Sequence, residues 1–205
     1  MTAPSTAAPI STPRRQGIAL FGTSADPPTL GHQALLEGLI HQFAQVATLA
    51  SDNPSKQHCI PLPQRLELLS TLVQAMDEPG LQLVQDLSSP YAITTLERAQ
   101  ARWPGQPLSF VVGSDLTDQI PGWKDAPALL HRCRLMIVPR EGWPLRQDAL
   151  ELLRSLGGQV DILPLSVPGT ASSTVRRHPT VDQIPAVLHP LLLKHNFYGF
   201  APGSS

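Results

Sequence analysis

The chain has no excess of charge of either sign, only two cysteines and no long apolar run. Its 15 Lys and Arg residues balance 16 Asp and Glu residues, so no overall field attracts a nucleic acid or an anionic membrane. No apolar stretch approaches the roughly 20 residues that a membrane-spanning helix needs. We therefore expect a soluble, cytoplasmic protein that binds neither nucleic acid nor membrane, and whose anionic ligands are small.

The two cysteines, Cys59 and Cys133, are far apart in the sequence and too few for a disulfide framework. This fits a reducing compartment and packed, reduced thiols. A zinc site with the neighbouring His58 and His131 would require the fold to join two distant segments. Structural zinc sites usually pair their ligands at short spacing, which neither segment shows, so we expect no metal ligands in the protein itself.

The first sixteen residues are almost all Ala, Pro, Ser and Thr, with Arg14 and Arg15 near the end. They have no apolar face to bury, so we expect a disordered tail over residues 1–16. A targeting peptide is the alternative, although the prolines are incompatible with an amphipathic helix. The rest has the length of one domain, which we place at residues 17–199, followed by a short C-terminal tail at residues 200–205.

Strand and helix patterns alternate along this domain. Continuous apolar runs predict strands at residues 17–22, 46–50, 81–84, 108–112, 135–138 and 160–163. Helical spacing of apolar residues predicts helices at residues 31–43, 63–76, 91–102 and 147–156. The alternation predicts an α/β fold, a Rossmann-like doubly wound parallel sheet with helices on both faces. Ligands of such sheets bind beyond the carboxyl ends of the strands, so we expect the site in the loops after Gly22, Ala50, Val84 and Val112.

The segment between the first strand and the first helix has the features of a phosphate site. It contains neither the GxGxxG fingerprint nor a P-loop, which disfavours a hydride-transfer cofactor. Thr29 is placed to be the N-cap of the helix, and His32 lies on the same face. Both are at the positive end of the helix dipole, where free N–H groups bind phosphate, and Gly22 allows close approach of the backbone. A capped helix with a surface histidine would show the same pattern.

A second helix N-terminus occurs at residues 171–177, where hydroxyl residues precede two arginines. Ser173 and Arg177 share a face of this helix. Hydroxyls, free N–H groups and a forked cation together form a phosphate grip. Taken alone, the pattern fits a capped surface helix with solvated arginines equally well.

Together the two segments resemble the bacterial nicotinate mononucleotide adenylyltransferase family, part of the HxGH nucleotidyltransferase superfamily. The family's GGTFDPxHxGH loop is GTSADPPTLGH here, at residues 22–32, and its ISSTxIR is ASSTVRR at residues 171–177. Weaker matches lie at residues 53–56, 90–96 and 110–116, the last followed by Trp123. The resemblance spans roughly residues 17 to 199.

The chain departs from the family at four loop positions. Thr29 replaces the first histidine of HxGH, and Thr23, Ala25 and Ser55 replace a glycine, an aromatic residue and the histidine before the loop lysine. Threonine in place of the first histidine occurs elsewhere in the superfamily, including the pantetheine-phosphate adenylyltransferases. The departures leave the class of chemistry intact and loosen the substrate assignment.

The resemblance implies transfer of AMP from ATP to the phosphate of nicotinate mononucleotide, which gives deamido-NAD and pyrophosphate in NAD biosynthesis. The attacking phosphate is already an anion, so the protein needs only to align the reactants and neutralise charge. Mg²⁺ bound through the ATP phosphates is the implied cofactor. The implied catalytic residues are His32, Thr29, Lys56 and Arg177.

The resemblance also implies two groups of binding residues. Those for ATP are Gly22, Thr23, Gly31, Gly113, Asp115, Ser172, Ser173 and Thr174. Asp115 would accept the ribose hydroxyls, with a helix cap as the alternative. Tyr91, Thr95 and Trp123 resemble the family's pyridine pocket, in which an aromatic ring stacks on the pyridine. The alternative for Trp123 is a place in the core or on the surface.

Two other functions stay open at this point. The first is the same chemistry on nicotinamide mononucleotide or phosphopantetheine; the pyridine-pocket segment argues against phosphopantetheine, whereas backbone donors decide between the acid and the amide. The second is a non-catalytic nucleotide-binding module, against which the retained His32, Lys56 and Arg177 argue. The sequence does not decide between a monomer and a homo-oligomer.

Overall fold

The computed structural model describes residues 15–53, 56–165 and 167–200. At its centre is a six-stranded sheet in which every paired strand runs parallel to its neighbour. The strands are β1 (Arg15–Thr23), β2 (Phe43–Ala50), β3 (Leu81–Leu83), β4 (Leu108–Gly113), β5 (Arg134–Val138) and β6 (Gln159–Ile162). Their order is β3-β2-β1-β4-β5-β6, which reverses direction between β1 and β4. In an open α/β sheet, ligands bind in the crevice at such a reversal.

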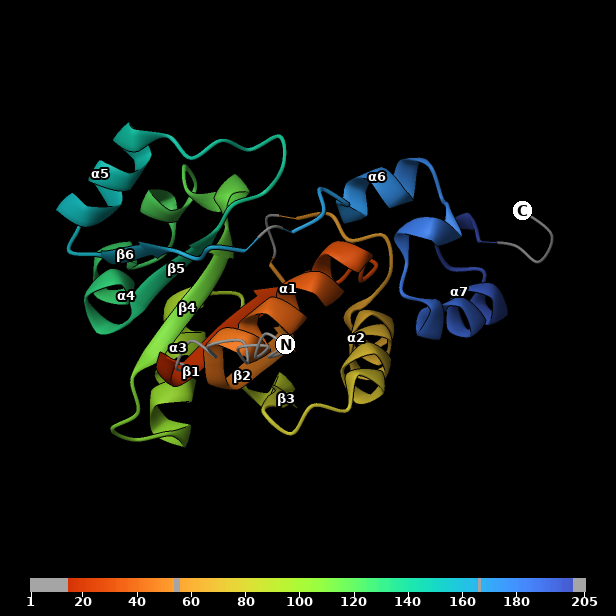
Figure 1. The fold of residues 1–205 in the computed structure, drawn as a ribbon, viewed down its shortest axis with the longest axis horizontal. Coiled ribbons are helices and arrows are strands. Elements are labelled where there is room, and N and C mark those ends of the chain that lie inside the picture. Colours follow the sequence, from red (N-terminus) through yellow and green to blue (C-terminus); the bar gives the residue numbers. More distant parts are fainter. Residues whose placement is uncertain (1–14, 54–55, 166, 201–205) are drawn as a thin grey trace, which may run out of the picture.

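Helices connect the strands and cover both faces of the sheet (Figure 1). They are α1 (Leu30–Gln42), α2 (Leu62–Met76), α3 (Ala92–Arg102), α4 (Ala126–Arg132), α5 (Gln147–Ser155), α6 (Ser172–Arg177) and α7 (His189–His195). Short 3₁₀ turns are η1 (Gln85–Leu87), η2 (Ser114–Leu116), η3 (Ile120–Gly122), η4 (Val181–Gln183), η5 (Ala186–Leu188) and η6 (Phe197–Gly199). Figure 1 shows α5 and β6 at one end of the molecule and α6 and α7 at the other.

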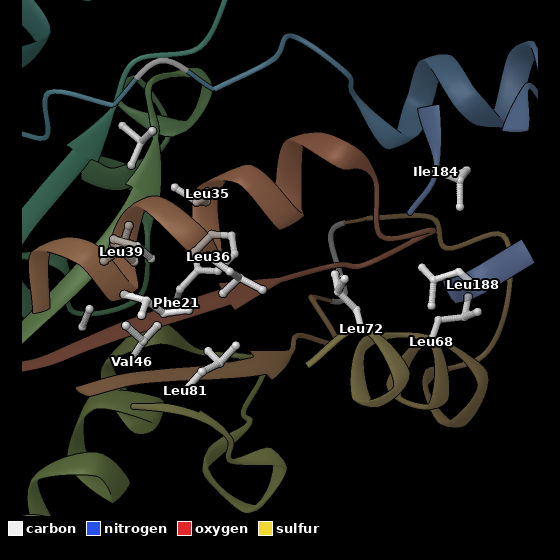
Figure 2. Close-up of a cluster of buried hydrophobic side chains, with 14 of the residues drawn as sticks. Phe21, Leu35, Leu36, Leu39, Val46, Leu68, Leu72, Leu81, Ile184 and Leu188 are labelled. Atoms are coloured by element: carbon white, nitrogen blue, oxygen red, sulfur yellow. The ribbon is translucent and has the colours of Figure 1, made fainter. Parts of the chain in front are cut away.

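Alternate side chains of the four central strands, β1, β2, β4 and β5, enter two separate cores. Phe21 belongs to the core beneath α1, whereas its neighbour Leu20 belongs to the core beneath α3, α4 and α5. This is the period of two expected when both faces of a strand are buried. In the first core the leucines of α1 lie over β1, β2 and β3, and Leu68 of α2 lies near Ile184 and Leu188 (Figure 2). The C-terminal segment is thus packed onto α2.

The structure confirms the predicted α/β class and the order of strands and helices. The sequence-based prediction omitted α4, because a helix of seven residues is too short for apolar periodicity to reveal. Two predicted boundaries were wrong. Arg15 pairs with Phe43, so Arg15 and Gln16 belong to the domain rather than to the tail. Phe200, assigned to the C-terminal tail, is buried in the first core.

The rest of the two predicted tails, residues 1–14 and 201–205, lies outside the described residues. In the part of the chain that the structure covers, no helix is both long enough and apolar enough to cross a membrane.

Candidate functional site

A cleft of about 1050 Å³ lies at the carboxyl ends of β1 and β4, where the strand order reverses. Its walls come from the loops that follow β1, β2, β4 and β5 and from the first residues of α3 and α6. These are segments far apart in the sequence, and each contributes polar side chains. The cleft has two chemically different ends. The cationic end has Lys56, Arg140 and Arg176 together with His32, and the aromatic end has Tyr91, Thr95, Trp123 and Lys124.

At the cationic end, Thr29 begins α1 as its N-cap and orients the ring of His32. The Thr29 N–H donates to His32 Nδ1 at 3.1 Å, and the Thr29 hydroxyl oxygen lies 2.9 Å from the same ring nitrogen. A neutral imidazole that accepts at Nδ1 carries its proton on Nε2. Burial, followed by the charges of Arg140 and Lys56, lowers the pKa of His32 to about 4. At neutral pH, His32 is therefore an uncharged hydrogen-bond donor in the wall of the cleft.

Thr29 itself lies beneath the cleft, which corrects the expectation that it contacts phosphate. Its side chain is 0% exposed, and its hydroxyl donates to the Thr170 carbonyl at 2.9 Å. A Cβ on Gly31 would lie 3.0 Å from the Pro168 carbonyl oxygen, which shows how closely this segment packs on the first turn of α1. Thr29 therefore acts on the site by holding His32.

The end of β1 brings the backbone to the cleft. Gly22 and Thr23 both line it, as predicted for ligand-contacting positions. A Cβ on Gly22 would lie 3.3 Å from Leu49 Cδ1, a tight contact with the neighbouring strand. Thr23 Oγ1 accepts the Ala25 N–H at 3.2 Å, so the threonine that replaces the family's second glycine stabilises the turn of the loop.

The loop after β2 carries Lys56 to the cleft, as predicted, together with His58. The side chain of His58 is 13% exposed, its Nδ1 lies 3.7 Å from Asp26 Oδ2, and its Nε2 lies 4.0 Å from Asp52 Oδ1. Burial and then the charge of Arg65 lower the pKa of His58. We had considered His58 only as a zinc ligand. Ser55, which replaces the family's loop histidine, lies outside the described residues.

A buried arginine of α2, Arg65, fixes these loops. Its Nη1 donates to the carbonyls of Ser24 at 2.8 Å and Ser51 at 2.7 Å, and its Nη2 donates to Asp52 Oδ1 at 2.7 Å. Sequence analysis missed it. The available signal was its position on the apolar face of α2, three residues before Leu68, where a charged side chain must find partners.

On α6, the arginine that lines the cleft is one that sequence analysis did not name. Arg176 lines the cleft, and its Nη1 donates to the Asp26 carbonyl at 2.6 Å. Arg177 is exposed and donates through Nε to the Ser173 carbonyl at 3.2 Å. Neither Arg177 nor Thr174 is among the described residues that line the cleft. Adjacent helical residues point about 100° apart, so the sequence alone could not decide which arginine faces inward.

The two serines of α6 are both at the cleft, as predicted. The Ser172 hydroxyl donates to the Pro27 carbonyl at 2.8 Å and so joins α6 to the loop after β1. Ser173 is exposed and lines the cleft. Ser172 is thus a structural contact, and Ser173 is the hydroxyl free to meet a ligand.

The loop after β4 places Asp115 in the cleft wall. Arg140 Nη1 donates to Asp115 Oδ2 at 3.2 Å, whereas Oδ1 is buried and has no hydrogen-bond partner among the described residues. A Cβ on Gly113 would collide with Asp115 Oδ1 and Arg140 Cδ, so a side chain at this position would displace both of these groups. The N-cap of η2 is Gly113, and Asp115 makes no capping hydrogen bond, which disfavours the interpretation of Asp115 as a helix cap.

The loop after β5 supplies two cleft residues that sequence analysis missed, Arg140 and Trp143. Ser114 Oγ accepts the Arg140 N–H at 3.0 Å and donates to the Trp143 carbonyl at 2.8 Å, which fixes this loop against the end of β4. Trp143 is 56% exposed. An exposed tryptophan at a cleft indicates a binding site, but the sequence does not show which tryptophans are exposed, because exposure depends on the fold.

At the aromatic end, the structure brings together the three residues of the predicted pyridine pocket. Tyr91 is the N-cap of α3, Thr95 lies one turn further on, and Trp123 follows η3. Trp123 packs edge-on against Phe110 with ring centroids 6.3 Å apart, so one side of the indole is held by the core while the side chain lines the cleft. Lys124 Nζ lies 4.5 Å from the centre of the Tyr91 ring.

No group of three His, Cys, Asp or Glu side chains is arranged to hold a metal ion within the described ranges. Cys133 is buried, and burial raises the pKa of its thiol to about 12. Cys59 is exposed, so the expectation of packed thiols was wrong for this cysteine.

Comparison with known proteins gives the following matches. Residues 20–178 match the cytidylyltransferase-like family. The chain is 38% identical over 196 residues to a probable nicotinate-nucleotide adenylyltransferase of Synechocystis sp., covering 88% of this chain and 98% of that protein. A probable nicotinate-nucleotide adenylyltransferase of Thermus thermophilus is 27% identical over 195 residues, with the same coverage of 88% and 98%.

Among solved structures, the fold is similar to that of Plasmodium falciparum nicotinic acid mononucleotide adenylyltransferase complexed with NaAD. The TM-score is 0.73 at 17% sequence identity, and the match covers 91% of this chain and 98% of that one.

Proposed function

The chain belongs to the cytidylyltransferase-like family and, within it, to the nicotinate-nucleotide adenylyltransferases, and from this premise we propose that it transfers AMP from ATP to the phosphate of nicotinate mononucleotide. The products are deamido-NAD and pyrophosphate, which makes the reaction a step of NAD biosynthesis. The observation that carries the proposal is the cleft itself, in which a cationic end and an aromatic end meet at the reversal of the strand order.

The cationic end suits an in-line displacement at phosphorus. A phosphate oxygen of the acceptor attacks the α-phosphorus of ATP, and the bond from that phosphorus to the bridging oxygen breaks as pyrophosphate leaves with the electron pair. The attacking phosphate is already an anion, so no protein base is needed. His32 is fixed by Thr29 as a neutral Nε2–H donor, and it can stabilise charge on the reacting phosphate without first losing or gaining a proton.

The cations approach from three separate segments of the chain. Lys56 comes from the loop after β2, Arg140 from the loop after β5 and Arg176 from α6. We assign them to the phosphates of ATP and of the leaving pyrophosphate, because charge-assisted hydrogen bonds to phosphate are the strong kind. Ser173 adds a hydroxyl at the same end.

The half-buried carboxylate of Asp115 supports an adenosine site at the end of β4. Its Oδ1 is desolvated and without a hydrogen-bond partner among the residues described, a costly state unless a ligand donates to it. A ribose offers two hydroxyl donors, and Gly113 leaves room for it to approach. We therefore assign Asp115 to the ribose of ATP.

The aromatic end suits a pyridine ring that carries a carboxylate. Trp123 is braced by Phe110, so its indole can stack on a ring without reorganising. The exposed Lys124 brings a positive charge to this end, over the ring of Tyr91. That charge favours the carboxylate of nicotinate mononucleotide over the neutral amide group of nicotinamide mononucleotide. The aromatic surface favours either of these acceptors over phosphopantetheine.

We propose that Mg²⁺ enters the site with ATP, bound through the phosphates. The cleft fits this arrangement, because no carboxylate cluster among the described residues would hold the ion alone, whereas the cationic side chains suit the phosphates that carry it. When bound, Mg²⁺ would neutralise part of the phosphate charge.

Pyrophosphate release from ATP, measured with each acceptor in turn, tests the proposal. We expect the highest kcat/KM with nicotinate mononucleotide, a lower value with nicotinamide mononucleotide and no turnover with phosphopantetheine. A higher kcat/KM with nicotinamide mononucleotide would mean that this amide, and not nicotinate mononucleotide, is the acceptor. Absence of turnover with all three acceptors would indicate that the chain is a non-catalytic nucleotide-binding module.

A further inference from the structure

Tyr198 joins the C-terminal segment to the loop after β1. Its hydroxyl donates to Asp26 Oδ1 at 2.8 Å, across 172 residues of sequence. Both side chains are buried, with exposures of 8% and 1%. Asn196 and Tyr198 have positive φ angles of 50° and 58°, a conformation that L-residues rarely adopt, so their contacts must hold this turn in place.

Asp26 connects this bond to the cationic end of the cleft. Its Oδ2 accepts the Cys59 N–H at 2.8 Å, which fastens the loop that carries Lys56. Its backbone carbonyl accepts from Arg176 Nη1 at 2.6 Å, and the same nitrogen lies 3.7 Å from Oδ2. His58 Nδ1 also lies 3.7 Å from Oδ2. One buried carboxylate therefore contacts the segments that supply two of the cations.

The Tyr198 hydroxyl makes a hydrogen bond that a phenylalanine ring at the same position could not make. The ring packs in the core beneath α1 and meets Phe197 edge-on at 6.3 Å, and a phenylalanine would provide both of these contacts. Burial and then the charge of Asp26 raise the pKa of Tyr198 above its ordinary value, so the hydroxyl stays protonated as a donor. Its hydrogen bond is the contact that specifies tyrosine.

We propose that Tyr198 is a positioning residue, which holds the Asp26 carboxylate in one orientation and thereby keeps Arg176 and the Lys56 loop in place for the phosphates. This rests on the proposed function, because it assigns those cations to the reacting phosphates. Without the hydroxyl, Oδ1 would be buried and unpaired, and the carboxylate would turn toward Arg176 and draw its guanidinium out of the cleft.

The first test is Tyr198→Phe, which removes only the hydroxyl. We expect kcat to fall about tenfold while the KM of nicotinate mononucleotide changes less than about twofold, because misplaced groups impair alignment more than acceptor binding. The matched control is Phe197→Leu, which weakens packing in the same segment but leaves the hydrogen bond, and should lower the Tm with kcat kept. Asp26→Asn, which keeps the shape of the side chain but cannot accept at both positions, should reproduce the loss of kcat even if Tyr198→Phe folds poorly.

A double-mutant cycle with Arg176→Ala separates positioning from general stability. If Tyr198 acts through Arg176, Tyr198→Phe should cost less than about threefold in kcat in the Arg176→Ala background. An equal loss in both backgrounds, or wild-type kcat in Tyr198→Phe and Asp26→Asn, would overturn the positioning role. Absence of turnover in the wild-type enzyme would instead overturn the proposed function, so the two failures are distinguishable.

Discussion

The two ends of the cleft are built in different ways. At the aromatic end, Tyr91 and Thr95 lie one turn apart on one helix, and Trp123 rests on a core aromatic, so local sequence and apolar packing suffice. At the cationic end, residues from two helices and two loops are held by buried polar contacts that span much of the chain, such as those of Arg65 and Asp26. Substitutions at the aromatic end should therefore affect one substrate, whereas substitutions at the cationic end should affect the chemical step.

The largest effect should come from His32, at the centre of the cationic end. We expect His32→Ala to lower kcat roughly 10²-fold or more with little change in the KM of ATP, as for the loss of a preorganised donor to the transition state. Thr29→Ala should lower kcat less, because it removes the hydroxyl contact to His32 Nδ1 but keeps the Thr29 N–H that donates to this nitrogen, and it should cost about 1 kcal/mol of stability from the lost cap. Steady-state kinetics with thermal melts measures both. Wild-type kcat in His32→Ala would make His32 a mere first-turn residue.

The pair of arginines on α6 gives the next largest contrast. Arg176→Ala should lower kcat by about tenfold or more, because it removes a cation from the cleft wall. Arg177→Ala changes the charge of the same helix by the same amount but should stay within about twofold of wild type, since its side chain is exposed and outside that wall. Kinetics of the two variants side by side checks this. A larger loss for Arg177→Ala would restore the assignment made from the sequence.

At the aromatic end, Trp123→Ala should raise the KM of the acceptor and leave that of ATP nearly unchanged. The expected loss is roughly 1 to 2 kcal/mol of stacking and burial, or about 5- to 30-fold. Trp103→Ala is the control, because Trp103 also packs against the core beneath α3 but is not among the described residues that line the cleft. Equal changes in both KM values for Trp123→Ala would make its role structural.

A smaller effect is expected from Lys124, which should help to distinguish the acid from the amide. Lys124→Gln should lower the ratio of kcat/KM for nicotinate mononucleotide to that for nicotinamide mononucleotide by about two- to fivefold, since an exposed charge is partly screened. Lys194→Gln on α7 removes the same charge far from the cleft and should leave the ratio alone. An unchanged ratio in Lys124→Gln would mean that backbone N–H donors, and not Lys124, select the carboxylate of the acceptor.

The pH dependence of stability gives the last contrast. The pKa of His32 is lowered from its ordinary value to about 4, so the unfolded chain takes up the proton first as the pH falls. The stability linked to His32 is complete above about pH 6.5 and declines as the pH falls toward 4. Urea unfolding at pH 7 and pH 5 should show a smaller drop in His32→Gln than in wild type. The same drop in both would mean that His32 titrates normally.

The sequence predicted the sheet, most helices and the aromatic end, because these depend on periodicity and on short motifs. Residues 91–95 and Trp123 could be recognised without knowing the fold. Even α6 was placed correctly, although the choice between Arg176 and Arg177 needed the rotation of a helix of only six residues, which the sequence does not specify.

The parts that could not be predicted depend on contacts between distant segments. Arg65 looked like a charged interruption of an apolar face, and Arg140 like any loop residue. Nothing in the sequence around Tyr198 indicates that its hydroxyl donates a hydrogen bond to Asp26. The burial of Thr29 could not be predicted either: its pattern shows a capping residue near phosphate, whereas residues 168–170 pack over its side chain in the structure.

In the proposed function, the cationic end performs AMP transfer onto an acceptor bound at the aromatic end. The most direct measurement is chromatographic identification of the product formed from ATP and nicotinate mononucleotide by the wild type, Arg176→Ala and Trp123→Ala. We predict deamido-NAD in all three, with Arg176→Ala slowed at saturating substrates and Trp123→Ala restored to near wild-type rate by excess acceptor. ATP binding without formation of deamido-NAD by the wild type would contradict the account.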